Sequence, residues 1–127
     1  MPENNKIMVV EDNDFVRMQI VRFLIDEGYH VVECTDGEDA VQKVKDEKGK
    51  VSMAIVDVRM EPIDGFEFIR TIRGFGITIP VILVTGDQNP DLLSESAKLG
   101  VAAVLMKPVQ RDRLITTISR TLRVGKR

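Results

Sequence analysis

The stretch SMAIVDVRMEPIDG, residues 52–65, contains the feature that decides the fold. Met53 to Val56 form a short apolar run of the kind that fills the middle of a buried parallel sheet. Asp57 follows directly, so that a carboxylate stands where a core strand ends. A charge held there costs free energy unless other groups neutralise it. The stretch therefore predicts a buried strand with a functional site at its carboxyl end.

Apolar runs alternate with helical periodicity on both sides of this stretch. Besides residues 51–56, runs of strand length cover residues 7–10, 31–34, 79–85 and 102–106. Between and after them, apolar residues recur at helical spacing. The helical segments are expected to begin at Asn13 or Asp14, Asp36, Asp64 and Pro90, and ahead of Leu114. Gly28 and Gly100 are expected to end two of them, and the polar segment 46–50 another.

This alternation predicts an α/β fold with a doubly wound parallel sheet. Five strands that alternate with five helices need a sheet covered by helices on both faces. The flavodoxin-like strand order 2-1-3-4-5 is expected, with five helices on two faces.

Length and composition predict one ordinary globular domain over residues 1–127. The chain is 43% hydrophobic and 30% charged, and its net charge of −2 gives no general attraction to nucleic acid or anionic membranes. Its apolar runs are far shorter than the ~20 residues of a membrane helix. The single cysteine, Cys34, fits a reducing compartment. We therefore expect a cytoplasmic protein with no membrane or direct nucleic-acid partner.

Polar side chains follow four of the predicted strands. Glu11 and Asp12 follow the first strand, Asp57 the third, Thr85 ends the fourth, and Lys107 follows the fifth. Ligands of open parallel sheets bind outside the carboxyl ends of the strands, where the strand order reverses. We therefore expect these five side chains to converge there.

The acidic members of this set predict a magnesium site. Three carboxylates close together repel by several kcal/mol unless a cation neutralises them, and Lys107 alone is not enough. Oxygen ligands of this kind suit Mg²⁺. Asp57, beside Mg²⁺, an ammonium and a hydroxyl, is then arranged to attack a phosphoryl group and become an aspartyl phosphate.

Four motifs carry a resemblance to a known family. VVEDND, IVDVRMEPIDG, ILVTG and LMKPV together resemble the receiver domain of bacterial two-component response regulators, including the chemotaxis regulators. The resemblance covers essentially all 127 residues, with the motifs in the family's order. It implies a phosphorylation-activated signalling switch that catalyses its own phosphorylation and dephosphorylation but is not an enzyme acting on a separate substrate.

The resemblance also implies roles for individual residues. Asp57 would accept a phosphoryl group from a sensor histidine kinase or a histidine phosphotransfer protein. Asp57, Glu11, Asp12 and the backbone carbonyl of Arg59 would surround Mg²⁺. Lys107 would contact the phosphate, and the peptide bond that follows it would be cis. On activation, Thr85 would swing toward the phosphate. The surface formed by the fourth helix, fifth strand and fifth helix would then change and bind an effector or a second copy of the domain.

Three departures from the family pattern affect these expectations. The acidic pair is Glu-Asp, and Glu61 precedes Pro62 where the family usually has its proline one residue earlier. Val104 occupies a position at which many members carry Tyr or Phe, so the usual aromatic rotation is not available. We expect activation to be transmitted through Thr85 and the segment 86–93 instead. Arg59 is expected to pair with a residue of that segment, Asp87, and so hinder water.

Other classes of protein fit the sequence less well. A hydrolase of the haloacid dehalogenase type would carry a second Asp where Arg59 stands. A flavodoxin-type nucleotide or flavin module would need a phosphate-binding loop after the first strand, and EDND, residues 11–14, is acidic. A receiver that no longer accepts phosphate would lack some of these residues, but all of them are present.

Overall fold

The computed structural model describes residues 5–47, 50–87 and 89–125. Parts of the predicted helix-ending segment 46–50, the loop segment 86–93 and the C-terminal RVGKR lie outside the described residues. The strands are β1 (Lys6–Val10), β2 (His30–Cys34), β3 (Met53–Asp57), β4 (Val81–Thr85) and β5 (Ala103–Met106). They form one parallel sheet in the predicted order β2-β1-β3-β4-β5.

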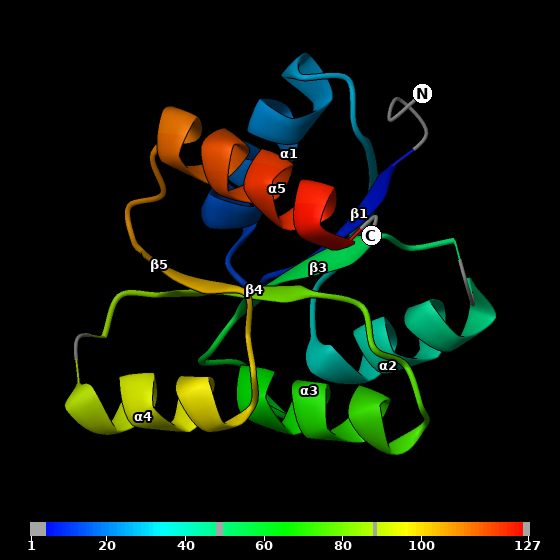
Figure 1. The fold of residues 1–127 in the computed structure, drawn as a ribbon, viewed down its shortest axis with the longest axis vertical. Helices are drawn as coiled ribbons and strands as arrows, with labels where there is room; N and C mark the ends of the chain where they lie inside the picture. The colour runs from blue at the N-terminus through cyan, green and yellow to red at the C-terminus, as the bar shows by residue number, and fades with distance from the viewer. Residues whose placement is uncertain (1–4, 48–49, 88, 126–127) are drawn as a thin grey trace.

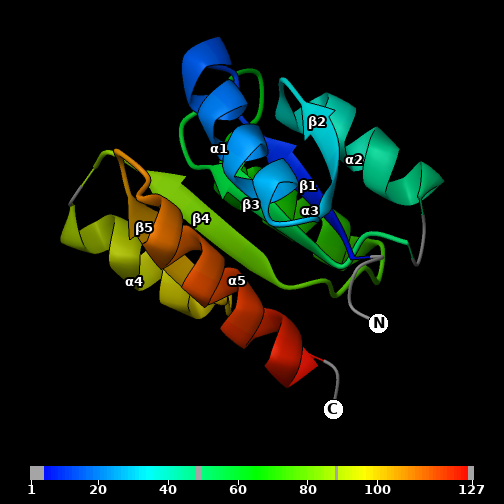
Figure 2. The same cartoon turned by 90° about the horizontal axis from the view of Figure 1, so that it is seen from above.

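Helices cover both faces of the sheet, as predicted (Figure 1). They are α1 (Asp14–Asp26), α2 (Gly37–Asp46), α3 (Gly65–Gly74), α4 (Pro90–Lys98) and α5 (Arg111–Gly125). Figure 2 shows α1 and α5 side by side on one face, while α2, α3 and α4 cover the other. No helix in the described ranges is long and apolar enough to cross a membrane.

The sheet has a hydrophobic core on each face, and alternate residues of each central strand pack into one core or the other. In β1, Ile7 and Val9 pack with α1 and α5, whereas Met8 and Val10 pack with α2, α3 and α4. Both faces of the strand are therefore apolar, which explains why its sequence does not alternate with polar residues.

The predicted helix caps are confirmed at three helices. The side chain of Asn13 accepts the Val16 N–H at 3.0 Å, and Asp36 caps α2 in the same way. Asp64 forms a reciprocal capping box with Glu67 at the start of α3. The helix-ending glycines also have the expected left-handed conformation, with φ of 89° at Gly28 and 68° at Gly100.

The third and fourth strands differ from the predicted boundaries. β3 begins at Met53 rather than at residue 51 and includes Asp57, because Asp57 is in register with Val84 of β4. β4 begins at Val81 rather than residue 79, because Pro80 has no N–H to donate to the sheet. The carboxylate of Asp57 is consequently held at the end of the sheet instead of in the loop after it.

Candidate functional site

A pocket of about 540 Å³ lies outside the carboxyl ends of the central strands. It is lined by Glu11, Asp12, Asn13, Asp57, Arg59, Thr85, Gly86, Asp87 and Lys107. The structure therefore brings every residue predicted for the site to one pocket at the strand ends.

The acidic residues meet because β1 and β3 are neighbours in the sheet. Carboxylate oxygens of Glu11, Asp12 and Asp57 lie within 4.8 Å of one another. Glu11 and Asp57 are 1% and 5% exposed, whereas Asp12 is open to solvent. The Nζ of Lys107 lies 3.2 Å from Glu11 Oε1 and 3.3 Å from Asp57 Oδ1. One ammonium group thus bridges two buried carboxylates.

The cluster of Glu11, Asp12 and Asp57 has too little positive charge around it to neutralise three carboxylates. Burial, and then the negative charge of Asp57, raise the pKa of Glu11 to about 7. Glu11 Oε1 is buried and accepts no hydrogen bond from the described part of the chain, although Lys107 lies near it. A hard divalent cation would supply both the charge and the missing partner, and the acidic donors are all oxygen atoms. The residues present therefore fit Mg²⁺.

Thr85 is buried at the end of β4, with 1% of its surface exposed. Its Oγ1 accepts a hydrogen bond from the backbone N–H of Asp87 at 3.0 Å. The hydroxyl is thus linked to the β4–α4 loop, and any movement of Thr85 toward the carboxylates changes a contact of that loop.

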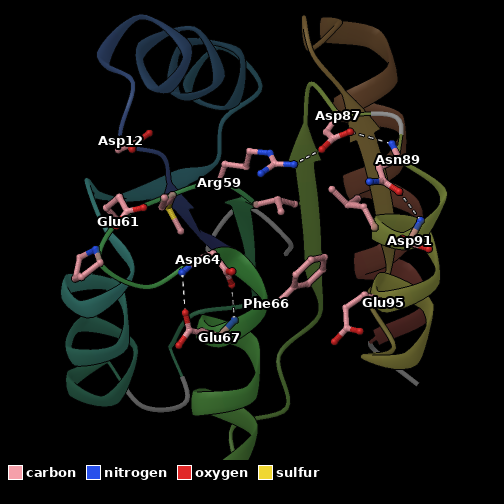
Figure 3. Close-up of a pocket in the computed structure, with 14 residues that line it drawn as sticks. Asp12, Arg59, Glu61, Asp64, Phe66, Glu67, Asp87, Asn89, Asp91 and Glu95 are labelled. Atoms are coloured by element: carbon pink, nitrogen blue, oxygen red, sulfur yellow. Dashed lines mark hydrogen bonds and ion pairs between the residues drawn. The ribbon is translucent and has the colours of Figure 1, made fainter.

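Two loops at the rim of the pocket contain cis prolines. The Lys107–Pro108 peptide bond is cis, as the resemblance implies. The Glu61–Pro62 bond is cis as well, at the place where the sequence departs from the family pattern. On the same rim, the side chain of Arg59 pairs with that of Asp87, and Figure 3 shows this contact as a dashed line.

Arg17 supports the acidic loop and was not identified from the sequence. Its guanidinium donates to the backbone carbonyl of Glu11 at 2.8 Å, to Asp14 at 2.6 Å and to Glu33 at 3.3 Å. Its side chain is only 12% exposed. An Arg on a helix that carries other charges gives no sequence signal for such a role, because the contact to Glu11 is made to the backbone.

Gly65 is a second residue that sequence reasoning missed. A Cβ added at Gly65 would lie 2.7 Å from the backbone oxygen of Asp57. The Gly65 N–H donates to the Val58 carbonyl at 2.8 Å, which brings the start of α3 against the end of β3. A glycine that follows a capping Asp is a recognisable signal for this close approach.

Comparison with known proteins identifies similar chains. The family model described as "Response regulator receiver domain" matches residues 7–119. The chemotaxis protein CheY of Treponema pallidum is 29% identical over 93% of this chain and 83% of its own length. CheY of Bacillus subtilis is 27% identical over 93% of this chain and 98% of its own length.

A solved structure is similar to this chain over nearly its whole length, whereas two longer relatives are matched over only a small part of theirs. The crystal structure of Vibrio cholerae CheY4 has a TM-score of 0.84 at 28% identity, covering 92% of this chain and 98% of that one. The chain spans only 17% of the sensor kinase/phosphatase CqsS of V. cholerae and 27% of the transcriptional regulatory protein ZraR of Klebsiella oxytoca.

Proposed function

Because the chain belongs to the response regulator receiver domain family of two-component signalling, we propose that it is a switch activated by phosphorylation of Asp57. The observation that carries the proposal is the contact between Asp57, Glu11 and Lys107. It holds a strand-end carboxylate beside an ammonium group and a second, poorly neutralised acid. A purely structural role for these residues would not require three carboxylates beside the single ammonium group of Lys107.

In the proposed reaction, an oxygen of Asp57 attacks the phosphorus atom of a phosphohistidine. The bond between phosphorus and the imidazole nitrogen breaks, the nitrogen keeps the electron pair, and an aspartyl phosphate forms. Lys107 attracts a phosphoryl oxygen and neutralises part of its charge, because its Nζ already lies 3.3 Å from Asp57. The Thr85 hydroxyl, at the end of the next strand, donates to another phosphoryl oxygen.

Glu11, Asp12, Asp57 and the backbone carbonyl of Arg59 hold Mg²⁺ in this proposal. When bound, Mg²⁺ neutralises charge that develops on the transferred phosphoryl group. The contribution of the protein is to bring the carboxylates together before the ion arrives. The shared pocket, the oxygen donors and Glu11 Oε1, which accepts no hydrogen bond from the described part of the chain, support this assignment.

The partners and output follow from the proposed switch. The phosphoryl donor is a sensor histidine kinase or a histidine phosphotransfer protein in the cytoplasm, and the receiver domain occupies residues 1–127. After phosphorylation, the surface of α4, β5 and α5 changes and binds an effector or a second copy of the domain. No direct contact with nucleic acid or a membrane is proposed.

Mass measurement of the intact protein tests the proposal. Incubation with phosphoramidate and Mg²⁺ is expected to add one phosphoryl group to the wild-type chain and none to Asp57→Asn. EDTA should abolish the adduct. Adduct formation at a comparable rate in Asp57→Asn, or in EDTA, would contradict the mechanism.

A further inference from the structure

A groove between α3 and α4, drawn in Figure 3, adjoins the pocket that contains Asp57, and the linings of the two share Asp12, Arg59 and Asp87. Its volume is about 560 Å³. Its apolar lining consists of Val58, Met60, Pro62, Phe66 and Leu92. Phe66 is half-buried, so part of its ring is free to contact another molecule.

The same groove has an acidic rim. Its lining includes seven carboxylates, at Asp12, Glu61, Asp64, Glu67, Asp87, Asp91 and Glu95, and one cationic residue, Arg59. Asp87 pairs with Arg59, and Glu95 pairs with Arg70 of α3.

The other five carboxylates of the lining form no ion pair in the described part of the chain, and one of them, Asp12, also belongs to the acidic cluster of the neighbouring pocket. Asp64 and Glu67 are engaged in the capping box of α3. Glu61 and Asp91 form no ion pair within residues 5–47, 50–87 and 89–125. An apolar floor with unpaired acids above it is complementary to a side-chain pair that is apolar and cationic.

The α4 wall of this groove is linked to the phosphorylation pocket by three consecutive hydrogen bonds. The Asp87 N–H donates to Thr85 Oγ1 at 3.0 Å, and the Asn89 N–H donates to Asp87 Oδ1 at 2.9 Å. The Asp91 N–H then donates to Asn89 Oδ1 at 2.8 Å. A displacement of the Thr85 hydroxyl breaks the first bond and releases the segment that positions Asp91.

These hydrogen bonds end at Asp91, which lies on the side of α4 that faces the groove. Val104, on β5, is half-buried and too short for a large rotation. An ion pair between Arg70 and Glu95 also joins α3 to α4 beside the groove. Release of the Thr85 bond therefore acts on the groove.

We propose that the α3–α4 groove binds a segment of another protein that presents a cationic side chain next to a large apolar one. The apolar group contacts Phe66 and the floor, and the cation lies beside Asp91 at the α4 wall. The hydrogen bonds from Thr85 to Asp91 make the affinity of the groove depend on the state of the Thr85 hydroxyl. Only this last step rests on the proposed phosphorylation of Asp57.

Binding of a defined peptide tests the groove itself. The probe is a fluorescein-labelled octapeptide of alternating Leu and Arg, measured by anisotropy with saturating Mg²⁺, against the same peptide with Glu in place of Arg. Asp91→Lys is compared with Asp112→Lys, since both acids lie in the first turn of a helix and both variants change the net charge equally.

The Leu–Arg peptide is expected to bind, and the Leu–Glu peptide is not. Asp91→Lys should weaken binding roughly fivefold, which corresponds to about 1 kcal/mol, while Asp112→Lys leaves it nearly unchanged. Phe66→Ala should weaken it as well. No binding of the Leu–Arg peptide, or equal weakening by both Lys variants, overturns the proposal. Dimerisation of the protein alone that Asp91→Lys abolishes would also overturn it, because a second copy would then be the occupant.

A second comparison separates the coupling from the proposed function. Beryllofluoride with Mg²⁺ should change the affinity for the Leu–Arg peptide in the wild-type chain but not in Thr85→Val. The phosphoryl adduct on Asp57 is measured in parallel by mass. If the adduct forms and the affinity is the same with and without beryllofluoride, the coupling is wrong and phosphorylation stands. If no adduct forms, the proposed function fails, whereas specific peptide binding still supports the groove.

Discussion

The guanidinium of Arg59 and the carboxylate of Asp87 form an ion pair between the loops that follow β3 and β4. Both residues line the pocket that contains Asp57. Asp87 is held a second time, because its Oδ1 accepts the N–H of Asn89. Pairing with Arg59, and then the Asn89 hydrogen bond, lower the pKa of Asp87. The carboxylate is therefore ionised at neutral pH and can keep this contact at the pocket rim.

This ion pair is predicted to lengthen the lifetime of the phosphorylated state. Arg59→Ala and Asp87→Ala should each speed loss of the phosphoryl group by roughly twofold to fivefold, the range that an exposed ion pair can produce. The physical reason is that the pair hinders the approach of water to the phosphorus atom. The measurement is the decay of phosphoprotein after removal of the phosphodonor.

A double mutant separates this role from two independent surface charges. Because both substitutions break the same contact, the Arg59→Ala, Asp87→Ala chain should lose phosphate little faster than either single variant. Unchanged half-lives in both single variants would contradict the role of the pair.

The raised pKa of Glu11 predicts that the metal-free domain loses stability as pH rises. The folded state binds a proton on Glu11 that the unfolded state releases at its ordinary pKa of 4.5. Its contribution is therefore complete below pH 4.5 and is lost as pH rises through about 7. The total effect is at most about 3 kcal/mol. Urea unfolding in EDTA across this interval measures it.

Glu11→Gln provides the control for this pH dependence. The amide has no charge to lose, so the variant should exceed the wild-type chain in stability at pH 8 in EDTA and approach it at pH 5. Mg²⁺ should reverse the order at pH 8, because it stabilises the wild-type cluster by mass action. Identical pH dependence in the two chains would show that Glu11 is not the titrating group.

Arg17 is predicted to position the acidic loop for Mg²⁺. Arg17→Ala should weaken Mg²⁺ binding about tenfold, as loss of groups that orient metal ligands typically does. Arg22→Ala on the same helix is the control, since Arg22 is 79% exposed and pairs only with Asp26 in the described chain. The measurement is the Mg²⁺ dependence of the melting temperature. Arg17→Lys should recover only part of the affinity, because an ammonium cannot reproduce the three guanidinium contacts.

The switch is predicted to depend on Thr85 rather than on Val104. Addition of beryllofluoride and Mg²⁺ should change the NMR chemical shifts of the described residues of segment 86–93 strongly. Thr85→Val should suppress these changes, and Val104→Ala should leave them nearly intact. Large shifts centred on Val104, with a silent 86–93 segment, would contradict this prediction.

The sheet and its site were predictable because strand ends carry strong local signals. Asp57 and Thr85 each terminate a buried apolar run, and the strand order then fixes where such residues meet. The caps at Asn13 and Asp64 were readable for the same reason, since a short polar side chain before a helical period has few other roles.

The remaining features depend on tertiary contacts that no local pattern records. Arg17 reaches a backbone carbonyl, and its sequence neighbours do not reveal that target. The groove floor combines residues from the end of β3, α3 and α4, which are distant in sequence. The deficit of positive charge around Glu11 likewise appears only when the burial of each carboxylate is known.

Chemical mapping of the phosphorylated residue tests the central claim most directly. Borohydride reduces an aspartyl phosphate to homoserine, so the phosphorylated chain can be reduced, digested and sequenced by mass spectrometry. The account predicts homoserine at position 57, formed only when the phosphodonor and Mg²⁺ are both present. Homoserine at Asp12 instead, or a phosphoester on Thr85 that resists reduction, would contradict it.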